Sequence, residues 1–155
     1  MTATPNVQGV EETLRNLREF PRATGRNVLR RALVKAAQPV AIVARSYAPD
    51  DPATPAPDLK RSIAVATQLT RGQKQAGPRL NEVEVYVGPT VQAGRSVLRY
   101  AAIQEFGSYK QPARPYMRPA WDRTQPMVMA ILTRELTVEY EAAAARLARK
   151  FFKLR

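Results

Sequence analysis

Two stretches with apolar residues at helical spacing constrain the fold of this chain more than any other feature. The first predicts a helix over residues 24–48, with Thr24 as its N-cap and Pro39 as an internal kink. Its apolar stripe consists of Leu29, Leu33, Ala36, Val40, Val43 and Tyr47. Off this stripe lie Arg26, Arg30, Arg31, Lys35 and Arg45, which we expect on a solvated face.

The second stretch predicts a helix over residues 125–152, capped by Thr124 or Gln125, with Pro126 in its first turn. Its stripe consists of Leu132, Leu136, Tyr140, Ala143, Leu147 and Phe151. Two helices of this length are difficult to bury against one small sheet. Part of their surface is therefore expected to pack against another subunit.

Between the helices, apolar residues alternate with polar ones and predict an antiparallel hairpin over residues 60–88. Residues 71–80 form its long basic loop, in which Arg71, Lys74 and Arg79 are candidate contacts for a partner or for DNA. Residues 90–97 are ambiguous between a loop and a third strand. The sequence then predicts a short helix over residues 98–106, ended by Gly107 as its C-cap.

The remaining segments complete a single α+β domain over residues 1–155. Residues 1–7 are expected to form a flexible arm, and residues 7–20 a short amphipathic helix. Residues 49–58 read as a stiff proline-rich loop.

Histidine and cysteine are both absent, which removes the most common general base, zinc ligand and thiol nucleophile. The adjacent acidic pairs, at 11–12 and 50–51, are not spaced to face each other as an acid–base dyad. Phosphate-binding glycine motifs are missing. The sequence therefore predicts a protein without enzymatic activity, cofactor or metal site. A carboxylate- or serine-dependent enzyme is the distant alternative.

The chain is strongly basic, with a net charge of +12 that is spread along its whole length. One interpretation is contact with nucleic-acid phosphates, which would make the protein a basic, non-specific nucleic-acid-binding protein. The simpler interpretation is a soluble face, or pairing of arginines with acidic neighbouring subunits. The chain lacks a basic stretch interleaved with aromatics, which favours the simpler interpretation. Apolar runs of membrane-spanning length are absent too, so we expect a cytoplasmic or virion protein.

Residues 100–122, here called the aromatic segment, concentrate the side-chain types that are enriched at protein–protein hot spots. Prolines 112, 115 and 119 are expected to hold the segment extended. Its candidate interface residues are Tyr100, Glu105, Phe106, Tyr109, Arg114, Tyr116, Arg118 and Trp121. The alternative is a loop that covers the chain's own core, with Trp121 buried.

The aromatic segment resembles the signature of the tail-completion, or head–tail joining, family of lambdoid long-tailed phages. That family carries a pattern close to Tyr-Ala-x-x-x-Glu-Phe-Gly-Thr, followed by Pro-Ala-Arg-Pro-Phe-x-Arg-Pro-Ala. The chain matches the first half at residues 100–107, with Ser108 in place of Thr. It matches the second half at residues 112–120, with Tyr116 in place of Phe.

A second similarity lies upstream, where Ala48-Pro49 ends the first long helix and residues 59–63 read Leu-Lys-Arg-Ser-Ile. The chain departs from the family by replacing a compact Thr-Gly turn with residues 50–57. The resemblance implies a small α+β protein at the phage neck or the top of the tail. It also implies a structural role in a homo-oligomeric ring, usually a hexamer, that completes the tail or joins it to the head.

The resemblance further implies neighbouring head-completion and tail proteins as partners, and a location in the virion after synthesis in the host cytoplasm. Arg114 and Arg118 could pair with acidic residues across a subunit boundary, and Glu105 could accept from one of them. Arginines that face the channel would meet genomic DNA without sequence preference. A tail terminator or a head-completion (stopper) ring protein remains an alternative within the same class.

Overall fold

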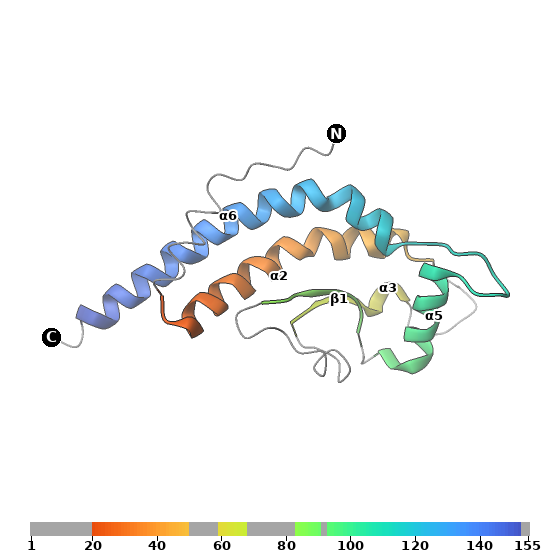
Figure 1. The fold of residues 1–155 in the computed structure, drawn as a ribbon, viewed down its shortest axis with the longest axis horizontal. Coiled ribbons are helices and arrows are strands. Elements are labelled where there is room, and N and C mark those ends of the chain that lie inside the picture. Colours follow the sequence, from red (N-terminus) through yellow and green to blue (C-terminus); the bar gives the residue numbers. More distant parts are fainter. Residues whose placement is uncertain (1–19, 50–58, 68–82, 91–92, 153–155) are drawn as a thin grey trace.

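The structure, a computed structural model, describes residues 20–49, 59–67, 83–90 and 93–152 (Figure 1). Two long helices run side by side in opposite directions, a two-stranded sheet lies along the first, and a shorter helix stands at one end. The elements in chain order are α2 (Arg22–Tyr47), α3 (Leu59–Ser62), β1 (Ile63–Ala66), β2 (Tyr86–Pro89), α5 (Gly94–Phe106) and α6 (Met117–Phe152). This architecture confirms the predicted α+β fold class.

Helix α2 begins slightly earlier than predicted, and its N-cap is Pro21 rather than Thr24. The Pro21 carbonyl oxygen accepts hydrogen bonds from the N–H groups of Thr24 and Gly25, at 2.8 and 3.2 Å. The predicted cap at Thr24 is wrong, because this residue already lies in the first turn. Proline suits the entry to a helix because its missing N–H would have no helical partner there. The helix continues through Pro39.

Small and medium apolar side chains fill the contact between α2 and α6. The buried residues of this contact are Val28, Ala32, Ala36, Val40, Val128, Leu136 and Ala143. The predicted stripe of α2 is correct at Ala36 and Val40 but leaves out Val28 and Ala32, and its last member, Tyr47, is 38% exposed. The reason is that α2 is covered on two sides, by α6 and by the sheet with α3, so its buried surface is wider than one stripe.

An ion network joins the two long helices where the sequence predicted a solvated face on α2. Arg31 Nε donates to Glu139 Oε2 at 2.6 Å. Lys35 Nζ lies 2.8 Å from Glu135 Oε2 and 3.1 Å from Glu139 Oε1. Because Glu139 is buried, its charge needs these two cations, and the pairing helps to set the register between α2 and α6.

Helix α6 begins at Met117, well before the predicted start at residue 124 or 125. Thr124 is therefore not a cap; it lies inside the helix, and its hydroxyl donates to the Ala120 carbonyl oxygen at 2.7 Å. Pro119 falls in the first turn, where proline is tolerated. Pro126 lies in the interior rather than in the first turn. Within the described residues, no helix combines the length and the hydropathy needed to cross a membrane.

The sheet is smaller than the predicted hairpin. Strands β1 and β2 pair antiparallel, with Ile63 opposite Pro89 and Ala66 opposite Tyr86. Residues 60–62 belong to α3 rather than to a strand, and the Ser62 hydroxyl donates to the Leu59 carbonyl oxygen at 2.7 Å. The basic loop with Arg71, Lys74 and Arg79 lies outside the described residues, as do the arm and helix predicted before Phe20 and most of the proline-rich loop.

Neither alternative for residues 90–97, a loop or a third strand, holds over residues 94–97, because α5 already begins at Gly94. Gly94 has a φ of 86°, a conformation that glycine adopts without strain and that turns the chain into the helix. The predicted end of α5 is confirmed: Gly107 is its C-cap, and the Gly107 N–H donates to the Ile103 carbonyl oxygen at 2.7 Å.

Candidate subunit interface

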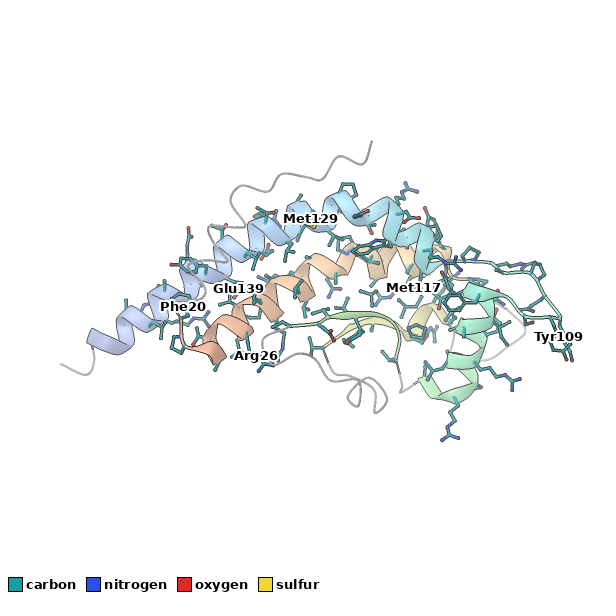
Figure 2. The ribbon with its side chains drawn as sticks, in the orientation of Figure 1. Phe20, Arg26, Tyr109, Met117, Met129 and Glu139 are labelled. Carbon is teal, nitrogen blue, oxygen red and sulfur yellow. The ribbon has the colours of Figure 1, made fainter. Side chains whose placement is uncertain are left out.

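The aromatic segment folds back on itself at the end of the molecule where α5 meets α6 (Figure 2). After Gly107, an isolated bridge joins Ser108 to Gln111, whose N–H···O distances are 2.9 and 3.3 Å. The Arg114 N–H then donates to the Gln104 carbonyl oxygen at 2.7 Å, which ties the returning chain to α5. Tyr109 lies at the far tip of this turn (Figure 2).

The prediction that prolines hold the whole segment extended is wrong for the turn at residues 108–111 and for residues 117–122. Residues between Gly107 and Pro115 lie outside any helix, but from Met117 onward the chain is helical, so Pro119 does not extend it. The contact that fixes where α6 begins comes from Glu105, which lies on α5 and not on α6.

Glu105 is 6% exposed and acts as the N-cap of α6 from outside that helix. Its Oε2 accepts from the backbone N–H groups of Tyr116 and Met117 at 2.8 and 2.9 Å. Its Oε1 accepts from the Arg118 backbone N–H at 3.1 Å and from Arg118 Nε at 3.2 Å. One carboxylate thus satisfies three donors at the start of α6, which otherwise have no partner within their own helix.

The electrostatics of Glu105 follow from these contacts. Burial by itself would raise the pKa of this carboxyl. The three backbone N–H groups and the Arg118 guanidinium outweigh burial, so the pKa lies below its ordinary value of 4.5. Glu105 is therefore ionised at neutral pH, and it pairs with Arg118 of the same chain.

Tyr116 is 1% exposed and belongs to the chain's own core, next to Ala101 and Ala120. Burial, and then the nearby Glu105 charge, raise the pKa of Tyr116 to about 12. Its phenol is therefore neutral at physiological pH and serves as a packing group. Tyr100 is half-buried and packs against the same cluster.

Other side chains of the segment face solvent. Phe106 is 73% exposed, Tyr109 91% and Trp121 47%. Trp121 is thus not buried as the core-covering alternative required. The Arg118 guanidinium carbon lies 5.4 Å from the Phe106 ring centroid, and Lys110 Nζ lies 5.2 Å from that of Tyr109.

The structure therefore separates the eight predicted interface residues into two groups. Tyr100, Glu105 and Tyr116 hold the segment in its conformation from within the chain. Exposed on the surface are Phe106, Tyr109, Arg114, Arg118 and Trp121. Lys110 was not among the predicted interface residues, although its place beside Tyr109 at the turn signals an exposed cation.

Replacing Gly107 by alanine is expected to lower the free energy of unfolding by about 1–3 kcal/mol from backbone strain alone. Gly107 has φ 78° and ψ 179°, and an added Cβ would lie 2.9 Å from the Ala113 backbone nitrogen. Urea unfolding followed by circular dichroism measures the change. The matched control is Gly94→Ala, because Gly94 also has a positive φ but an added Cβ there meets no atom within 4 Å. Gly94→Ala has the backbone strain without the close contact, so its loss should be smaller than that of Gly107→Ala. Equal losses at both positions would contradict a contribution from the approach to Ala113.

Comparison with protein families gives one match. A family described as "Bacteriophage HK97-gp10, putative tail-component" matches residues 11–107, which is more than half of the chain. The chain belongs to this family. The HK97 gp10-like match confirms the resemblance to phage tail components inferred from the motifs.

The HK97 gp10-like match ends at Gly107, so it includes the first half of the motif but not residues 108–122 or α6. No curated protein and no solved structure gives a significant match to this tail component. In the described residues, acidic side chains do not gather into a group that could hold a metal ion.

Proposed function

We propose that this tail component is a structural ring subunit of the phage neck, which completes the tail or joins the tail to the head. The observation that carries the proposal is the exposure of Phe106, Tyr109 and Trp121 at one end of the molecule. These are the side-chain types that dominate protein–protein hot spots. Membership in a tail-component family supplies the setting.

The backbone that presents these side chains is held rigidly. Glu105 caps α6, the Ser108–Gln111 bridge closes the turn, and Arg114 is tied to Gln104. A pre-organised surface loses little conformational entropy when it docks, so more of the contact free energy remains as affinity. The pre-organised surface therefore favours a permanent contact between the subunits of an assembly over a transient contact.

A ring requires a second, different patch on the same subunit, because each subunit meets its neighbour through a heterologous contact. The outer face of α6 is the best candidate. Met127 and Val138 are 56% and 49% exposed, and they lie eleven residues apart, which places them on the same side of the helix. We therefore propose that the aromatic tip of one subunit packs on the outer face of α6 of the next.

The test is the oligomeric state, with and without tail proteins, measured by native mass spectrometry and negative-stain imaging. The wild-type chain is expected to form rings, and a triple variant with Phe106, Tyr109 and Trp121 changed to alanine is expected to stay monomeric with an unchanged circular dichroism spectrum. Ile42→Ala is the control, because Ile42 is 61% exposed but lies outside both patches.

Two outcomes would overturn the proposal. One is a wild-type chain that remains monomeric under every condition, with no ring in the presence of tail proteins. The other is a triple variant that assembles as well as the Ile42→Ala control.

A further inference from the structure

Helix α5 presents an exposed face that is rich in positive charge. Arg95, Arg99, Ala102 and Phe106 are exposed and recur at spacings of four, three and four residues, so they share one side of the helix. Ser96 is exposed next to Arg95. The N-terminal half of this face thus offers two guanidinium groups, a hydroxyl and a methyl group.

Within the described residues, Arg95 and Arg99 are among the arginines whose side chains make no hydrogen bond or ion pair, as are Arg26 and Arg30 of α2. Arg31 and Arg118 bind glutamates, and Arg45 binds a backbone carbonyl oxygen. Within the described residues, neither Arg95 nor Arg99 makes a hydrogen bond or an ion pair. The only acid of α5 is Glu105, which is buried and committed to the start of α6.

The position of these arginines is unfavourable for the helix itself. Like charges four residues apart repel each other. Arg95 also lies in the first turn, where the helix dipole disfavours a cation, and no acidic residue balances it there. Neighbouring α3 contacts α5 and adds exposed Arg61, again with no carboxylate on that element. Uncompensated cations on adjoining elements are complementary to an extended anionic partner.

We propose that the Arg95–Arg99 half of the exposed face of α5 contacts the phosphate backbone of double-stranded DNA without sequence preference. DNA fits better than an acidic protein, because the Arg95–Arg99 half of the face lacks the large apolar side chain that protein interfaces bury at their centre. The net charge of +12 attracts a polyanion from a distance. The inference rests on the proposed function in one respect: the neck is the passage through which the genome moves.

Fluorescence anisotropy with a short duplex of mixed sequence tests the proposal across salt concentrations from about 50 to 200 mM. Losing two phosphate contacts in the R95A/R99A variant is expected to weaken binding about 10- to 60-fold near 100 mM salt. The slope of log K against log salt should become shallower by about 2. The R95K/R99K variant should keep most of the affinity, because lysine retains the charge.

The matched control is R26A/R30A on α2. Arg26 and Arg30 have the same spacing and are exposed, but they lie at the other end of the molecule, as the position of Arg26 indicates (Figure 2). This control should weaken binding less than about threefold, because it lowers only the overall charge.

Three results would overturn the inference. They are equal losses in both double alanine variants, no duplex binding by the wild-type chain at low salt, and a defect of R95A/R99A in joining tail proteins without any change in DNA affinity. The last result would identify the face as a protein-docking surface. Native mass spectrometry of R95A/R99A distinguishes a failure of this inference from a failure of the proposed function. If the variant still forms intact rings while its DNA binding is weakened, the substitutions have affected only the DNA contact of the α5 face.

Discussion

Replacing Glu105 by alanine is expected to lower the free energy of unfolding by about 2–4 kcal/mol. The variant would leave the N–H groups of Tyr116, Met117 and Arg118 without their shared acceptor in a largely buried position. It would also leave the Arg118 guanidinium without its carboxylate. A loss of this size is a large fraction of the stability of a typical single domain.

Urea unfolding followed by circular dichroism, at low protein concentration so that assembly does not add stability, measures this loss. Glu105→Gln is the control for charge, because its amide oxygen can still accept a hydrogen bond while the negative charge is gone. Its loss should fall between wild type and Glu105→Ala. An alanine variant as stable as the wild-type chain would rule out the role of Glu105 as the cap of α6.

The pH dependence of stability separates the stabilisation due to the negative charge of Glu105 from the stabilisation due to the shape of its side chain. Because the folded-state pKa lies below 4.5, the ionised carboxylate stabilises the fold fully above pH 4.5. That contribution disappears as the pH falls through the lowered pKa. Glu105→Gln should lack this part of the acid sensitivity and keep the part that arises from Glu135 and Glu139, whose pKa values are also lowered.

Replacing Tyr116 by alanine is the second change with a large expected effect, a loss of about 3–5 kcal/mol in the free energy of unfolding. Tyr116 is among the largest fully buried side chains of the described residues, and it contacts the cluster that joins α2, α3, β1, α5 and α6. Its removal would open a cavity where these elements meet. The same urea titration measures the change.

Tyr116→Phe is the matched control, and it should change the free energy of unfolding by less than about 1 kcal/mol. The ring stays the same, and the phenol of Tyr116 makes no hydrogen bond within the described residues. Phenylalanine also occupies this position in the family motif described above. A loss in Tyr116→Phe close to that of Tyr116→Ala would mean that the hydroxyl, and not the packing of the ring, stabilises this site.

Several features of the fold could be predicted from the sequence because they depend on local patterns. Helical spacing predicted α2 and α6, and alternation predicted a hairpin between them. The C-cap at Gly107 was predictable because glycine is the residue that most easily adopts a positive φ at a helix end. The motif over residues 100–120 suggested the family because its order of residue types is unusual, and the family match over residues 11–107 confirms it.

Contacts between distant parts of the chain escaped prediction. The start of α6 was misplaced because its cap, Glu105, belongs to α5 and approaches it only after the turn at 108–111. The pairing of Arg31 and Lys35 with Glu139 was missed because more than a hundred residues separate the partners. Local sequence cannot show that a carboxylate from another helix lies within reach.

The aromatic segment shows most clearly which properties depend on the sequence alone and which depend on the tertiary structure. The sequence by itself determined which side chains this segment carries, which family it marks, and that the chain lacks histidine and cysteine for catalysis. Only the tertiary structure decided that Tyr116 turns into the core while Phe106, Tyr109 and Trp121 face solvent. The physical reason is that burial depends on the elements that pack around a residue, and the elements around Tyr116 come from four other segments of the chain.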